Sequence, residues 1–212
     1  MRASSAATSN AIRGLALGQV ADGAMSQIGD LLLRMKELTV SANSQTFGPD
    51  DKEAAQKEYD KLAESITNIA NTTRYSGEVL LASVINIKIQ TGELSGDITE
   101  FDTQDLTAGA LAIEGQDLSG AAAAAGDAVD AAIKTLAAAR ADVGAFMRGL
   151  ESTISVNEVK NENLEAAVSV FMEADLAKEA TNLAMADIRS QMAQAMITKE
   201  NQAASNITGL VR

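Results

Sequence analysis

The sequence contains no cysteine, no histidine and no tryptophan, and only one proline among its 212 residues. Without cysteine the chain can form neither a disulfide nor a thiolate metal site. Without histidine and cysteine it lacks the commonest general base and an important class of nucleophile. The Glu-x-x-His pairs of carboxylate-bridged metal sites in helical bundles are excluded as well. These absences argue against an enzyme, and no catalytic residue, cofactor or metal site is predicted.

Long apolar runs and clustered basic residues are also missing. No stretch of 18 apolar residues occurs, so no membrane span is predicted. The net charge of −12 argues against nucleic acid as a partner, because phosphate binding relies on clustered lysine and arginine. The first residues, MRASSAATSN, lack the apolar segment of a secretory signal, so a protein that leaves the cell would need another export route.

What is present is a composition typical of long packed helices. Hydrophobic residues make up 46% of the chain but aromatic residues only 3%, so alanine and methionine supply much of the apolar surface. We therefore expect a mainly α fold. Its main part would be a long antiparallel helical bundle or coiled coil, with a small β-hairpin and a C-terminal helix.

Heptad spacing predicts the helices. Apolar residues between 10 and 42 alternate in steps of four and three, as in coiled coils. Gly48 and Pro49 interrupt this pattern, and a second helix is expected over residues 52–73, capped by Asp50 or Asp51. Two such helices joined by a short turn should pack antiparallel. The residues expected to be buried across the helix seams are Leu31, Leu38, Leu62, Ile66, Val143 and Leu150.

The middle of the chain changes character before helix resumes. Residues 84–89 alternate with period two and predict a strand, which a turn connects to a return strand over residues 98–101. From about Asp127 the heptad spacing returns, with Asn157 and Asn161 on the seam. A polar seam residue can fix helix register; the alternative is that both asparagines lie near a solvent-open stretch. Around residues 172–182 the pattern becomes irregular, and a separate final helix is expected after it.

This pattern divides the chain into four parts. Residues 1–80 form a long helix, a turn and a return helix; residues 81–120 hold the β-hairpin and irregular segments. Residues 121–172 form the returning helix of the core, and residues 173–212 a terminal helix. The terminal helix carries an apolar stripe at steps of three, four and seven, namely Ile188, Met192, Met196, Ala203, Ile207 and Leu210. A stripe of this extent favours assembly with further helices; the alternative is that the terminal helix folds onto the rest of the chain.

Several separate motifs resemble those of bacterial flagellin, in the order in which that family carries them. They are "DGAM", "LLLRMKELTVSANS", "EYDKLAESITNIANTTRYSGEVLL", "INIKIQTGE", "ARADVGAFMRGLESTI" and "ADLAKEATNLAMADIRSQMAQAMITKENQAASNITGLVR". Together they cover most of the chain. Within the family's pattern, no large insertion separates the β element from the C-terminal helix, so the chain resembles a short, core-only flagellin. The pattern also implies a further helix before Met1 that pairs with the terminal stripe, so we expect an N-terminally truncated fragment.

The resemblance implies a structural subunit of the flagellar filament, exported through the flagellum's own secretion channel into the extracellular filament. It implies other flagellin subunits, hook-associated and cap proteins and an export chaperone as partners. Two alternatives stay open. One is a hook–filament junction protein, which shares the terminal helices, and the other is a free-standing coiled-coil adaptor.

The resemblance also points to a surface patch that an animal Toll-like receptor detects on flagellins. Arg34, Leu38 and Glu58 match the residues of that patch. Leu33 and Ser41 depart from the glutamines that detected flagellins commonly carry on either side of it. We therefore expect receptor binding to be weak or absent; the alternative is that Arg34 and Glu58 are ordinary solvated charges. Leu38 is also expected on the helix seam, which conflicts with exposure.

Overall fold

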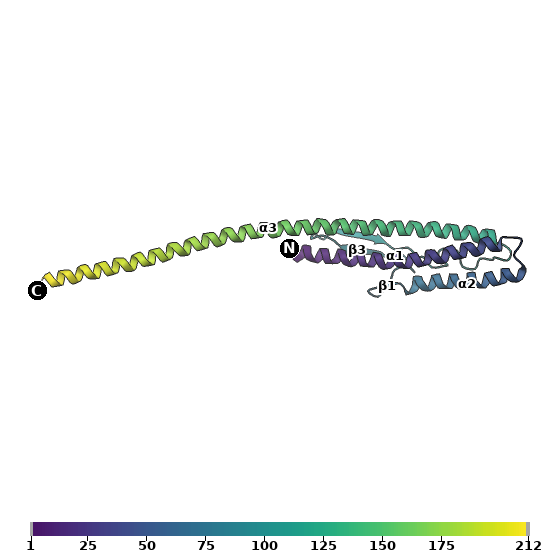
Figure 1. Ribbon diagram of the computed structural model, residues 1–212, viewed down its shortest axis with the longest axis horizontal. Coiled ribbons are helices and arrows are strands. Elements are labelled where there is room, and N and C mark those ends of the chain that lie inside the picture. The colour runs from purple at the N-terminus through teal and green to yellow at the C-terminus, as the bar shows by residue number, and fades with distance from the viewer. Residues whose placement is uncertain (1, 211–212) are drawn as a thin grey trace. The chain divides into compact units, whose positions relative to one another are not determined.

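The computed structural model describes residues 2–210, and the side chains of residues 3–203. It divides into two compact units, Met1–Val159 and Lys160–Arg212, shown together in Figure 1. The elements in chain order are α1 (Arg2–Ala42), α2 (Pro49–Thr72), β1 (Arg74–Tyr75), β2 (Glu78–Val79), β3 (Asn86–Gln90), β4 (Ile98–Asp102) and α3 (Ala122–Leu210). The predicted class, mainly α with a small β-hairpin and a C-terminal helix, is confirmed.

In the first unit, α1 lies between α2 and the first part of α3 (Figure 1). Lys36 on α1 pairs with Asp130 on α3 at 2.6 Å, and Asp22 on α1 pairs with Arg140 on α3 at 2.8 Å. Both ion pairs are partly exposed, so they fix which faces meet more than they add stability. The stabilising contribution comes from the apolar seams that these faces bury.

The predicted helix seams are correct in four of six positions. Leu38, Ile66, Val143 and Leu150 are buried, whereas Leu31 and Leu62 are only partly buried and pack at the edge of the core. Leu32 and Ala63, each one residue further along, are the buried residues at these places. The reason is that both helices pack on more than one neighbour. Each therefore buries a stripe wider than a heptad seam.

The predicted cap of α2 is wrong by two or three positions. Gly48 is the residue that caps the helix, and Pro49 occupies the first turn, where its missing N–H leaves nothing unpaired. Asp51 lies three residues after the cap, and its carboxylate accepts a hydrogen bond from the Gly48 backbone N–H at 3.2 Å. Asp51 therefore supports the helix start from within the first turn.

The predicted break between residues 172 and 182 is also wrong, because α3 continues through it. The heptad pattern becomes irregular there, but the segment MEADLAKEATN contains neither glycine nor proline and consists mostly of good helix formers. An irregular heptad changes which face of the helix is apolar. It does not end the helix.

The predicted hairpin is present as β3 and β4, which pair antiparallel with Ile87 opposite Phe101. The second strand begins at Ile98 as predicted, and the other three strand ends lie one or two residues from the predicted bounds. The hairpin packs on α1 where Gly14 allows it, since a Cβ at Gly14 would lie 2.3 Å from Ile89 Cδ1. Phe101 stacks on Phe146 of α3, with ring centroids 4.8 Å apart. A side chain at position 14 would therefore have to displace the terminal methyl groups of Ile89 and Leu150.

Two asparagines hold the hairpin at its turn end. Asn157 of α3 is 8% exposed and donates a hydrogen bond to the Thr91 carbonyl at 2.9 Å. Asn10 of α1 donates to the neighbouring Gln90 carbonyl at 3.2 Å. Asn157 is therefore a buried, hydrogen-bonded residue of the helix seam and does not lie near a solvent-open stretch. Asn161 belongs to the second unit and is partly exposed.

Tyr59 of α2 gives a prediction about pH. Its side chain is fully buried, and burial, followed by the charge of Asp60, raises the pKa of its phenol to about 12. Between the ordinary and the raised pKa the unfolded chain releases this proton while the folded chain keeps it, so stability falls as pH rises. From about pH 9 to about pH 11 we expect a loss of about 1 kcal/mol that Tyr59→Phe does not show.

The measurement is urea unfolding of wild type and variant at both pH values. Tyr75→Phe, which changes a half-buried phenol, is the matched control and should follow the wild type. Parallel pH profiles of wild type and Tyr59→Phe would contradict the raised pKa.

Candidate interaction surfaces

The first candidate surface is the predicted apolar stripe of the second unit. Ile188, Met192 and Met196 are 56%, 63% and 72% exposed, and Ala203 is exposed. Ile207 and Leu210 lie outside the residues whose side chains are described. Within the second unit, the described part of the stripe is therefore uncovered.

The exposure extends beyond the stripe, since every residue from 162 to 203 is exposed. The large apolar residues of this segment outside the stripe are Leu164, Val168, Val170, Phe171, Met172, Leu176, Leu183, Met185 and Ile197. Single exposed apolar residues are ordinary, but a continuous series on one helix marks an interaction site. An isolated helix also gains little stability from its own hydrogen bonds. The described residues of the second unit therefore bury none of these apolar side chains within the unit.

The second candidate surface is the predicted patch on α1 and α2. Arg34 Nε bonds to Glu58 Oε1 at 2.8 Å, and Arg34 Nη1 bonds to Glu37 Oε2 at 2.8 Å. These bonds, that to Glu58 first, raise the pKa of the guanidinium above its ordinary value. Leu38 is only 7% exposed. Thus the fold brings Arg34 and Glu58 together on the surface but places Leu38 in the core.

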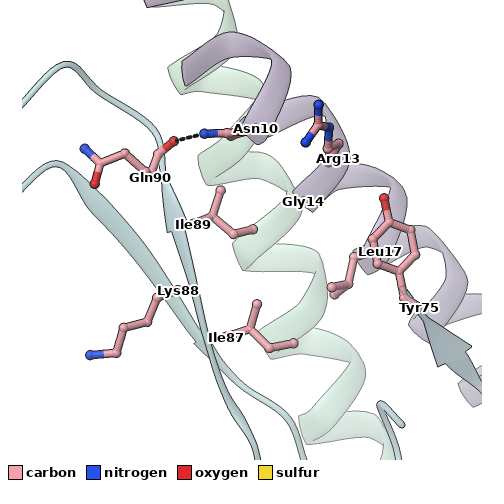
Figure 2. A pocket seen from close by; sticks show the side chains of 9 residues that line it. All are labelled: Asn10, Arg13, Gly14, Leu17, Tyr75, Ile87, Lys88, Ile89 and Gln90. Carbon is pink, nitrogen blue, oxygen red and sulfur yellow. Dashed lines mark hydrogen bonds between the residues drawn. The ribbon is translucent and has the colours of Figure 1, made fainter. Parts of the chain in front are cut away.

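A third feature is a groove of about 350 Å³ between α1 and β3. Figure 2 shows Leu17, Ile87 and Ile89 along it, the Tyr75 ring beside Leu17, and the Asn10–Gln90 hydrogen bond at one end. Lys88 points away from α1 and pairs with Glu100 at 2.9 Å. No carboxylate lines the groove, so its side chains form no acid–base pair. Its apolar residues hold the hairpin against α1.

The described residues hold neither a metal site nor a membrane span. No group of three or more acidic side chains in that part of the chain is arranged to hold a metal ion. None of the helices described has the length and hydropathy to cross a membrane. The features that stand out are thus surfaces for association with other proteins. They define a helical structural protein that is completed by partners.

Comparison with known proteins agrees with this class. The protein-family model for the bacterial flagellin N-terminal helical region matches residues 1–86 of this chain. The family model for the bacterial flagellin C-terminal helical region matches residues 127–211. A flagellin of Halalkalibacterium halodurans is 33% identical over 97% of this chain and 78% of its own length. A flagellin of Bacillus subtilis is 31% identical over 97% of this chain and 80% of its own.

Solved structures agree as well. A Bacillus cereus flagellin crystal structure superposes with a TM-score of 0.63 and 27% identity, covering 70% of this chain and 88% of that one. A putative flagellar hook-associated protein from Vibrio parahaemolyticus has a TM-score of 0.65 but only 10% identity, over 78% of this chain and 90% of that one, and so shows the fold alone. The chain belongs to the bacterial flagellin family. Flagellins are structural proteins, the subunits of the extracellular flagellar filament.

Proposed function

We propose that this chain assembles with further flagellin subunits by burying the apolar stripe of α3 in a shared helical layer. The exposure of every residue from 162 to 203 is the observation that carries this proposal. A lone helix of this composition has nothing of its own to cover Ile188, Met192 and Met196. Identical helices from neighbouring subunits, or an N-terminal helix of the same subunit, offer heptad seams of matching spacing.

The proposed arrangement assigns a place to each part of the chain. Residues 173–212 would line the inner tube of the filament, with residues 1–172 forming the core layer around it. The subunit would reach the filament by export through the flagellum's own channel. Hook-associated and cap proteins would meet the same subunit surfaces at the filament ends. An export chaperone would cover the terminal helix before assembly.

The alternative of a hook–filament junction protein has the weaker support. Its best observation is the fold similarity to the Vibrio protein at 10% identity. The flagellins of Halalkalibacterium halodurans and Bacillus subtilis are 33% and 31% identical over 97% of this chain. No observation favours a free-standing coiled-coil adaptor.

Polymerisation in ammonium sulfate tests the assembly proposal, because such salts strengthen the burial of apolar surface. We expect the full-length subunit to form filaments that sediment and are visible by electron microscopy. Met192→Asp should prevent them, since the added carboxylate would be buried without a partner. Ser190→Asp is the matched control: it adds the same charge two residues away, about 160° round the helix. Equal loss with both variants would mean that the stripe is not the assembling face.

For the receptor, we propose that binding of this chain to the animal Toll-like receptor is weak or absent. Two observations support this. Leu38 is withdrawn into the core, and the donors of Arg34 are engaged by Glu58 and Glu37. Titration of the receptor ectodomain against the chain tests the proposal, with Arg34→Ala in parallel. Tight binding that Arg34→Ala abolishes would overturn it.

A further inference from the structure

Among the described residues, buried methionines of α1 contrast with exposed methionines of α3. The chain has eight methionines and no cysteine, so thioethers are its sole sulfur groups. Met25 and Met35 of α1 are 1% and 0% exposed. Met185, Met192 and Met196 of α3 are 52%, 63% and 72% exposed. One sequence therefore carries both protected and accessible thioethers.

The three accessible methionines also share one face of α3. Steps of seven and four residues keep them within about 40° of one another at 3.6 residues per turn. Met192 and Met196 belong to the apolar stripe, and Met185 extends it toward the N-terminus of the helix. We call these residues, Met185, Met192 and Met196, the methionine face. Met172 is also exposed, but it lies about 140° round the helix from Met185.

We propose that the methionine face is a site of reversible oxidation by peroxide, and that its oxidation blocks assembly of the subunit. The thioether sulfur attacks one oxygen of a hydroperoxide, the O–O bond breaks, and an S–O bond forms. With hydrogen peroxide the second oxygen leaves as water. Sulfur is oxidised by two electrons and the peroxide is reduced by two. A thiol-dependent methionine sulfoxide reductase reverses the step, returning the thioether and forming water and a disulfide on the reductase side.

The consequence for assembly follows from the polarity of the product. A sulfoxide replaces a flexible apolar side chain by a polar, chiral one. Three such groups on one face would have to be buried without hydrogen-bond partners, which is unfavourable. The predicted oxidation of the methionine face follows from its exposure and does not depend on the proposed function. Its effect on assembly rests on the proposed function.

The reactivity is tested on the whole chain in dilute hydrogen peroxide, without polymerising salt. NMR of isotope-labelled methionine methyl groups follows each residue separately. We expect Met185, Met192 and Met196 to form sulfoxide at least about tenfold faster than Met25 and Met35, because susceptibility follows exposure. A sulfoxide reductase should then restore the original spectrum. Equal rates in the two groups would overturn the proposed site.

The effect on assembly is tested with a variant in which all three residues of the methionine face are replaced by leucine, a substitution that conserves volume and apolarity. Peroxide pretreatment should abolish sedimentation of the wild type in ammonium sulfate and leave the Met185→Leu, Met192→Leu, Met196→Leu variant assembling. Equal inhibition of both, or of neither, would overturn the proposed block. Failure of the untreated wild type to polymerise would instead contradict the proposed function, while the oxidation rates would still decide the site.

Discussion

Replacing Leu32 with alanine is expected to destabilise the first unit by about 2–5 kcal/mol. Leu32 is 0% exposed and lies in the continuous core cluster that α1 shares with its neighbours. Truncation removes apolar contacts and leaves a cavity that a packed core closes only in part. The change is read from the urea midpoint at constant slope.

Leu33→Ala is the matched control, because it removes the same atoms from the next residue of the same helix. Leu33 is 57% exposed, so its loss should change stability by less than about 0.5 kcal/mol. The pair also tests the helix register. If Leu31→Ala cost as much as Leu32→Ala, the seam would follow the predicted heptad positions and not those of the structure.

A second large effect is expected in hydrogen exchange. Amides of residues 162–203 should exchange at least about a thousandfold faster than those of residues 129–150, a difference of about 4 kcal/mol in opening free energy. The first unit opens only against the stability of a packed domain, typically 5–15 kcal/mol. Among residues 160–203 of the second unit, whose side chains the structure describes, none is buried. Mass spectrometry of exchanged peptides measures both segments in one sample.

The control for this experiment is the assembled state. In polymerising salt the amides of residues 162–203 should become protected, whereas those of residues 129–150 should change little. Slow exchange of both segments in the unassembled chain would refute the prediction. It would mean that the second unit buries its apolar stripe without a partner.

The parts of the fold that the sequence allowed us to predict are those with a regular period. The helices of the first unit repeat every three or four residues, and β3 every two. Errors of one residue, as at Leu31 and Leu62, arise because a heptad marks the centre of a stripe and not its width. The cap of α2 was misplaced because glycine offers no side chain by which to recognise it.

Two other parts have no such period. The short hairpin of β1 and β2 turns at Ser76 and Gly77, both with positive φ, and glycine there was the available signal. Residues 103–121 belong to no helix or strand, yet Leu106, Ile113 and Leu118 are buried. The Leu118 N–H donates to Gln56 Oε1 at 2.7 Å. Its partner lies far away in the sequence, so no local pattern could indicate it.

The candidate surfaces also differ in how much of each the sequence predicted. The stripe of α3 was predictable from the spacing of its apolar residues. Its extension to Met185 was not, because spacing alone does not show where along the helix the side chains become exposed. For Leu38 the sequence offered two incompatible roles. The structure assigns it to the core, since α1 turns this residue inward together with Met35.

The bonds of Asn10 and Asn157 to the turn end of the hairpin bear on the order of folding. The residues they join are 80 and 66 positions apart in the chain. Closing such long loops is entropically costly, so contacts of this kind form late, after helices and local turns. Loss of a late contact chiefly accelerates unfolding and leaves the folding rate nearly unchanged. We therefore expect Asn157→Ala to accelerate unfolding of the first unit more than it slows folding.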